Sequence, residues 1–133
     1  MIEEIDHVVL YSGDSEQTIR FWREVMGCAI ELEDEWRKGA IPIFRIRISP
    51  GHYLNVHPSG EVLTPRAATP APGTLDVCFR SGWSSAKVAA HFGEHGIDIE
   101  LGPVARSDAT GRRSSSIYVR DPDGNLVEVM SPA

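Results

Sequence analysis

Residues 118–128 have the sequence YVRDPDGNLVE, in which a polar four-residue segment lies between two apolar stretches. Proline fixes φ, glycine accepts positive φ, and aspartate bonds to nearby backbone, so Asp-Pro-Asp-Gly at 121–124 favours a tight turn. This turn predicts a hairpin that joins a strand at 115–120 to a strand at 126–130. The second half of the chain therefore ends in paired strands.

The residues before this hairpin predict a strand, a helix and another strand. A strand is expected at 75–79 and a helix at 84–95, in which Val88, Ala89 and Phe92 share one face before Gly96 ends the helix. A further strand is expected at 97–101. The order in the second half is thus one strand, one helix and three strands.

The first half of the chain has the same order of elements. A strand at 6–11 leads into a helix at 15–26, with Asp14 and Gln17 placed as in a capping box and Gly27 after the last turn. Strands are then expected at 29–32, 41–48 and 53–57. In the second of these strands arginines alternate with isoleucines, which indicates a solvated sheet face rather than an anion site.

A proline-rich segment separates the two halves. Residues 58–73 include four prolines and no periodic apolar pattern, so they cannot form an interior strand. The chain is therefore predicted to be one domain of two modules, about 1–58 and 74–133, with 59–73 as the connection. A repeated βαβββ unit exposes an apolar face that needs cover, which predicts an α+β fold with mainly antiparallel sheets.

Composition and charge exclude several classes of protein. The 133 residues are 41% hydrophobic and 24% charged, which is typical of a folded soluble domain. A net charge of −6 gives no attraction to nucleic acid or anionic lipid. No apolar run approaches the ~18–20 residues that cross a bilayer, and the acidic N-terminus is unlike a signal peptide, so a cytoplasmic location is expected. Cys28 and Cys78 are expected to be reduced and buried, with a disulfide between them left open.

Aligning the two halves predicts a metal site. The opening strands place His7 over Asp76, and the closing strands place His57 over Glu128, with separations of 50 and 52 residues within the halves. Glu128 lies among apolar residues, where a carboxylate is costly without a cation or strong donors. Imidazole nitrogen and carboxylate oxygen together suit a divalent transition metal, namely Zn, Ni, Co, Mn or Fe.

Five motifs stand out along the chain: DHV at 6–8, FW at 21–22, MG at 26–27, LNVH at 54–57 and YVRDPDGNLVE at 118–128. Together they resemble the vicinal oxygen chelate superfamily of glyoxalases, bleomycin resistance proteins and dioxygenases, and the resemblance covers nearly the whole chain. It implies paired βαβββ modules that form an incomplete barrel around one metal site, often in a homodimer. His7, His57 and Glu128 match ligand positions of the family. Asp76 departs from it, since many metal-binding members have histidine there.

The resemblance implies a glyoxalase-like lyase or isomerase that acts on a small substrate with two vicinal oxygens. Metal would stabilise the developing oxyanion, and Glu128 is the first candidate for the base, with Asp76 second. Tyr11 occupies the position where glyoxalase I has an arginine that holds glutathione. Tyr118 lies ten residues before the last ligand, as a tyrosine does in fosfomycin-resistance enzymes.

Three alternatives stay open within the same resemblance. A phosphonate substrate would have to recruit Arg112, Arg113 or Arg120. An extradiol-type dioxygenase would use two histidines and one carboxylate on iron or manganese. A metal-free, drug-binding protein like those of bleomycin resistance would instead use an aromatic groove, for which the candidates are Trp36, Trp83 and Tyr118.

Overall fold

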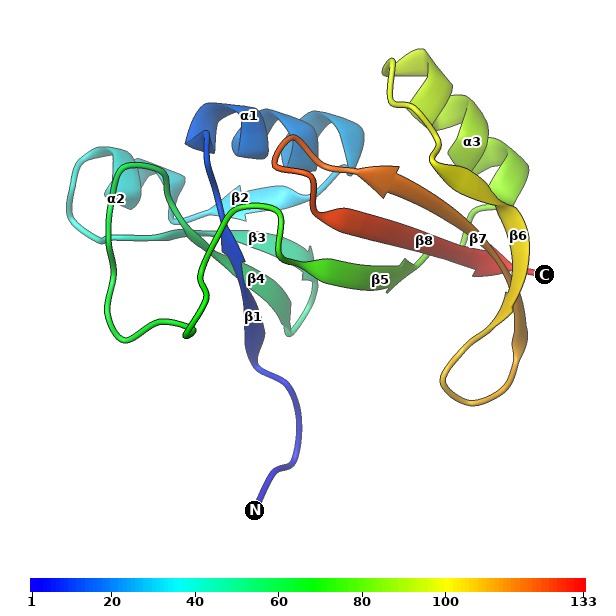
Figure 1. Ribbon diagram of the computed structural model, residues 1–133, viewed down its shortest axis with the longest axis horizontal. Coiled ribbons are helices and arrows are strands. Elements are labelled where there is room, and N and C mark those ends of the chain that lie inside the picture. Colours follow the sequence, from blue (N-terminus) through cyan, green and yellow to red (C-terminus); the bar gives the residue numbers. More distant parts are fainter. The chain divides into compact units, whose positions relative to one another are not determined.

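The computed structural model describes all of residues 1–133, in two compact units, Met1–Thr74 and Leu75–Ala133. Each unit contains one open four-stranded sheet (Figure 1). The strand order is β1-β4-β3-β2 in the N-terminal unit and β5-β8-β7-β6 in the C-terminal unit. In both sheets the first strand of the unit runs parallel to the last, and the other neighbours are antiparallel. These features confirm the α+β class and the twice-repeated βαβββ order.

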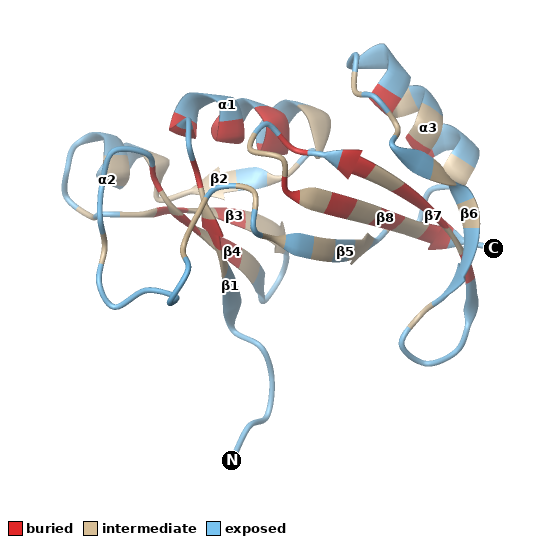
Figure 2. Cartoon of the chain, viewed as in Figure 1, coloured by how far each residue is buried: buried red, intermediate tan, exposed pale blue.

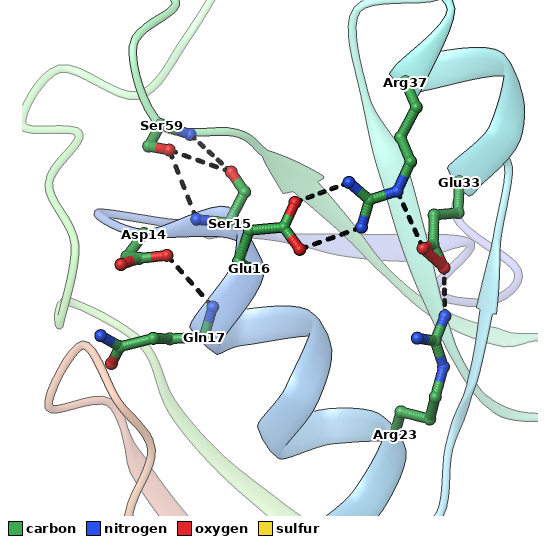
Figure 3. Close-up of polar contacts among 8 residues, drawn as sticks. All are labelled: Asp14, Ser15, Glu16, Gln17, Arg23, Glu33, Arg37 and Ser59. Atoms are coloured by element: carbon green, nitrogen blue, oxygen red, sulfur yellow. Dashed lines mark hydrogen bonds and ion pairs between the residues drawn. The ribbon is translucent and has the colours of Figure 1, made fainter.

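The N-terminal unit begins as the sequence predicts. Its elements are β1 (His7–Tyr11), α1 (Ser15–Arg20), a π-helical turn η1 (Phe21–Val25), β2 (Ala29–Glu31), α2 (Glu33–Arg37), β3 (Phe44–Ser49) and β4 (His52–His57). The Asp14 carboxylate accepts the backbone N–H of Gln17 at 3.1 Å, which caps α1 (Figure 3). The helix expected at 15–26 therefore forms, although its second part widens into η1.

One face of the first sheet forms the core of this unit. Side chains alternate along the strands, so one face is buried and the other is partly open. The buried set includes Leu10, Phe44, Ile46, Leu54 and Val56, with Ile19 and Trp22 from the helical segment. Burying each such side chain contributes about 1.5–3 kcal/mol. The open face carries His7, Val9 and Tyr11 beside Tyr53, Asn55 and His57.

Helix α2 is a short charged segment that the sequence patterns did not predict. None of its residues is buried. Arg37 donates to Glu16 at 2.6 Å and to Glu33 at 3.1 Å, and Arg23 also pairs with Glu33 (Figure 3). The Trp36 ring adds one contact with Phe44, at 4.7 Å between centroids. Because four of its five residues are charged and show no apolar periodicity, no pattern in the sequence predicts this helix.

The C-terminal unit places one helix against its sheet. Its elements are β5 (Asp76–Arg80), α3 (Ser85–Glu94), β6 (Leu101–Ser107), β7 (Arg113–Arg120) and β8 (Leu126–Pro132). Helix α3 lies against β6, β7 and β8 and buries Val88 and Phe92. Figure 2 shows buried and half-buried residues alternating along β8. No helix in the chain has the length and apolar character needed to cross a membrane.

The strand expected at 97–101 was placed wrongly, because β6 lies at Leu101–Ser107. Gly and Pro in this segment argue against a strand, but β6 is an edge strand, where proline is tolerated. The register shifts between Leu101 and Val104. Gly102 has φ +119°, and a Cβ there would lie 2.4 Å from the Ser116 carbonyl oxygen, so only glycine fits this close approach.

The predicted turn at 121–124 is confirmed and also anchors β5. Asp121 Oδ1 accepts the backbone N–H groups of Asp123 at 3.0 Å and Asn125 at 2.9 Å. The Asn125 amide donates to Asp121 Oδ2 at 2.8 Å, and its Oδ1 accepts the Leu75 N–H at 2.9 Å. The turn therefore fixes where β5 begins relative to β8.

Candidate functional site

His7 lies at the first position of β1 with one ring nitrogen already engaged. Its Nδ1 lies 2.7 Å from Asp6 Oδ2. A carboxylate can only accept, so Nδ1 carries the proton and Nε2 is left as the basic nitrogen. A carboxylate that orients histidine in this way is a common outer partner in metal sites. The His7 side chain is 40% exposed.

His57 ends β4 and lies beside Tyr11, its partner in the parallel pairing with β1. The two rings meet edge to face at 5.0 Å between centroids. Burial lowers the pKa of His57 below its usual value near 6.5, so the imidazole is neutral at pH 7 and able to bind a metal. The Tyr11 hydroxyl accepts the Ala67 N–H at 3.2 Å. Tyr11 and His57 also line a pocket of about 150 Å³ against residues 58–72.

Asn55 is a polar residue of the open face that the sequence reasoning missed. It lies on β4 between Val9 of β1 and Arg45 of β3. Its Oδ1 is buried and has no hydrogen-bond partner. An unpaired buried amide oxygen costs about 1–3 kcal/mol, which makes Asn55 Oδ1 a candidate to accept a hydrogen bond from a ligand or to coordinate a metal. The only signal in the sequence was a polar residue between the apolar residues Leu54 and Val56.

Glu128 lies half-buried in the middle of β8, between Cys78 of β5 and Tyr118 of β7. The pKa of the Cys78 thiol is raised to about 11, first by burial and then by the charge of Glu128 and its hydrogen bond with the thiol. The Tyr118 hydroxyl accepts Arg106 Nε at 3.0 Å. Both cysteines are free, but the expectation that they are buried was wrong, since Cys78 is exposed and Cys28 is half-buried.

The other predicted residues of the C-terminal unit lie further from Glu128. Asp76 is exposed at the first position of β5, opposite Leu126. Arg120 holds both Glu100 oxygens, at 2.7 and 3.1 Å, and also donates to the Gly124 carbonyl at 3.1 Å. Arg113 is exposed at the opposite end of β7, about 23 Å away along the strand. The structure therefore does not bring Arg113 and Arg120 together, and Arg120 already has partners.

The strand register corrects the alignment of the two halves. His7 pairs with Tyr53, so His57 lies four positions beyond the partner of His7. Asp76 pairs with Leu126, so Glu128 lies only two positions beyond the partner of Asp76. If His7 corresponds to Asp76, the counterpart of Glu128 is Asn55. The counterpart of His57 is then Met130.

Backbone hydrogen bonds at the ends of β1 and β5 give the same register. The Ser12 N–H donates to the His57 carbonyl, and the Ser81 N–H donates to the Met130 carbonyl. Aligning Ser12 with Ser81 also aligns His7 with Asp76. The expected match of His57 with Glu128 was therefore wrong by two residues, because spacing along the sequence does not record the length of the β3–β4 and β7–β8 turns.

The possible metal ligands do not form a cluster within either unit. No three His, Cys, Asp or Glu side chains of one unit are placed to hold a metal ion. In the first unit, Asn55 and His57 lie two and four positions beyond the strand partner of His7. In the second unit, Glu128 lies two positions beyond the strand partner of Asp76. The donor atoms are imidazole nitrogen, amide oxygen and carboxylate oxygen, which suit a borderline divalent metal.

Comparison with known proteins extends over nearly the whole chain. The virulence protein STM3117 of Salmonella typhimurium is 38% identical over 129 residues, covering 97% of this chain and 84% of that protein. Its crystal structure matches with a TM-score of 0.86 at 34% identity, covering 100% of this chain and 99% of that one. The glyoxalase domain-containing protein RDO1 of Mycosarcoma maydis is 37% identical over 130 residues, covering 98% and 69%.

A likeness of fold alone extends to a lactoylglutathione lyase from Agrobacterium tumefaciens, with a TM-score of 0.68 at 23% identity, covering 98% of this chain and 94% of that one. A family model described as the Glyoxalase/Bleomycin resistance protein/Dioxygenase superfamily matches residues 4–129. This span includes both βαβββ units and all of the candidate residues. The chain belongs to the Glyoxalase/Bleomycin resistance protein/Dioxygenase superfamily.

Proposed function

We propose that the protein is a metal-dependent, glyoxalase-like enzyme of lyase or isomerase type that acts on a small substrate with two vicinal oxygens. The observation that carries this proposal is Glu128, a half-buried carboxylate on an apolar strand that forms no ion pair with a basic side chain. Its nearest strand partners are a thiol and a phenol. A carboxylate so placed is suited to a cation or to proton transfer.

The proposed ligands of the metal are His7, His57, Asp76 and Glu128. A divalent Zn, Ni, Co, Mn or Fe ion would act as a Lewis acid on the substrate oxygens. His7 supports the assignment because Asp6 fixes its tautomer, and His57 because its lowered pKa leaves it neutral. Asn55 is an added candidate, since its Oδ1 is buried without a partner at the register position that corresponds to Glu128.

The proposed chemistry uses Glu128 as the base that removes a proton from carbon. Tyr118, beside Glu128 on β7, would donate its phenolic proton toward a substrate oxygen, and Arg106 holds the ring in place through the hydroxyl. Tyr11 would contact the substrate from the N-terminal unit. Arg113 would attract an anionic substrate, whereas Arg120 would have to leave Glu100 to do so.

Metal titration of the untagged protein tests the ligand assignment. Stripped protein should gain about one equivalent of metal and a higher melting temperature, and His7→Ala and Glu128→Gln should each lose this stabilisation. A comparison of His57→Ala with Asn55→Leu identifies which residue of β4 binds the metal. His52→Ala is the control histidine of the same strand. Wild-type affinity no tighter than tens of micromolar for Zn, Ni, Co and Mn, without stabilisation, refutes the metal site.

A substrate screen tests the reaction. Candidates are 2-oxoaldehyde thiohemiacetals, hydroxy-keto acids and catechols, since each presents two adjacent oxygens. Turnover should fall by about two orders of magnitude or more in Glu128→Gln while folding is retained. Equal activity in both proteins means that Glu128 is not the base. Saturable binding of apolar drugs without turnover would instead identify a binding protein. A homodimer is also expected, and sedimentation equilibrium tests it.

A further inference from the structure

Two histidines that the proposed reaction does not use lie together on helix α3 of the C-terminal unit. His91 is in the last turn of α3, and His95 follows four residues later at the end of the helix. Residues four apart on a helix are neighbours on its surface. Their ring centroids are 4.3 Å apart with planes inclined by 46°. His95 is exposed and His91 half-buried, so the pair is open to solvent on one side.

The hydrogen bonding of His95 prepares it as a ligand. Its Nδ1 lies 2.9 Å from the backbone carbonyl oxygen of His91. A carbonyl oxygen only accepts, so Nδ1 carries the proton and Nε2 is the basic nitrogen. Metal-binding histidines commonly donate their other N–H to a backbone carbonyl, which fixes both tautomer and ring orientation. The ring is thus held in the form that binds a metal.

The place of the pair on the helix also favours a cation. The carbonyl groups at the end of α3 carry the negative end of the helix dipole, which stabilises positive charge by about 0.3–1 kcal/mol at an exposed site. Lys87, one turn before His91, is the basic group on the same element that faces this region. Its Nζ lies 3.9 Å from the centre of the Trp83 ring, which holds the ammonium by a cation–π contact. The positive charge of Lys87 therefore opposes the binding of a cation at His91 and His95, but only moderately.

We propose that His91 and His95 form a two-histidine chelate for a late first-row divalent ion, with water completing the coordination. Two imidazoles and water suit the tetragonal geometry of Cu(II) and Ni(II), and affinity should follow the order Cu(II) above Ni(II) and Zn(II). Hard ions such as Mg(II) and Ca(II) should not bind, since they prefer oxygen donors. The chelate uses no residue of the proposed catalytic site, so either can be wrong without the other.

Trp83 provides a direct signal of occupancy. Its ring meets the His91 ring edge to face at 5.5 Å between centroids. Bound Cu(II) quenches the fluorescence of a nearby indole, so titration of the untagged full chain with Cu(II) should give saturable quenching. Trp83→Phe should abolish this quenching while calorimetry still detects the bound ion. The loss of quenching in Trp83→Phe separates the Trp83 signal from any signal of Trp22 and Trp36, which belong to the N-terminal unit.

Substitutions of the two ligands decide the proposal. His91→Ala and His95→Ala should each weaken Cu(II) binding roughly tenfold or more, since one of two ligands is lost. Lys87→Met should strengthen it several-fold, because a nearby positive charge is removed. His52→Ala, a histidine of β4 outside both proposed sites, is the control and should leave the quenching curve unchanged. Unchanged binding in both His91→Ala and His95→Ala, or equal affinity for Mg(II), overturns the chelate.

Discussion

In the parallel pairing of β5 with β8, Cys78 is the direct partner of Glu128, and the two side chains share the open face of the second sheet. Burial and the neighbouring carboxylate together raise the pKa of the Cys78 thiol to about 11. Although Cys78 is exposed, its thiol is therefore protonated and slow to react at neutral pH. The reactivity of the Cys78 thiol therefore reports the charge on Glu128.

Glu128→Gln is expected to increase the reactivity of Cys78 toward iodoacetamide at pH 8–9. Removing the carboxylate lowers the thiol pKa, and each unit of pKa changes the thiolate fraction by about tenfold. Peptide mass spectrometry measures the rate. Cys28 is the internal control, because burial alone raises its pKa to about 11. Equal rates for Cys78 in both proteins would show that Glu128 does not act on the thiol.

His57 is expected to titrate below pH 6.5, since burial disfavours its charged form. At low pH the unfolded chain binds a proton at His57 more readily than the folded chain does. The contribution of His57 to the free energy of unfolding is therefore fully present above the unfolded pKa. It is lost as pH falls through 6.5 toward the folded pKa. Imidazole NMR signals give the pKa directly. Urea unfolding at pH 7 and pH 5 should show a smaller loss in His57→Gln than in wild type, with His52→Gln as control.

Gly102→Ala is expected to destabilise the protein by about 2 kcal/mol or more, because the new Cβ would lie 2.4 Å from the Ser116 carbonyl oxygen at a positive φ. Gly93→Ala is the matched control. Gly93 lies in α3 with nothing within 4 Å of its Cβ position, so alanine should stabilise the helix by up to about 1 kcal/mol. Urea unfolding measures both, and equal effects would contradict the close approach.

Asn125→Ala is expected to cost about 2–4 kcal/mol, since it removes a buried amide that bonds both Asp121 and the Leu75 N–H. Asp121 would lose a donor while it stays buried, where burial already raises its pKa. Glu94→Ala, on the exposed end of α3, should change stability by less than about 0.5 kcal/mol. Thermal unfolding followed by circular dichroism measures the pair.

The repeat, the turn at 121–124 and the Asp14 cap were predicted because each depends on local chemistry. Asp14 and Ser84 cap their helices as short polar side chains do, and alternation along β4 and β8 marks their buried faces. β6 was misplaced because its glycine and proline suit an edge strand only once the neighbouring strand is known. α2 was missed because charges, not apolar spacing, hold it.

The candidate site was predicted less well than the fold. His7, His57 and Glu128 were identifiable as polar residues in apolar strands, but their register depends on how β1 pairs with β4 and β5 with β8. That pairing is a property of the sheet and not of the sequence spacing. Asn55 was missed for this reason. The partners of Arg120 and Cys78 were missed because they come from other strands.

Helix α2 also has a consequence for how the protein responds to its ionic environment. The segment has no buried residue and is held by ion pairs in which Arg23, Arg37 and Glu16 are exposed and Glu33 is half-buried. Salt screens such pairs, with a Debye length of about 3 Å at 1 M, and leaves the apolar core intact. Local opening of residues 33–37 should therefore become more frequent at high salt while global unfolding hardly changes. Trypsin should then cleave after Arg37 faster in 1 M NaCl than in dilute buffer. Ionic strength, more than temperature, should therefore set how long residues 33–37 survive proteolysis.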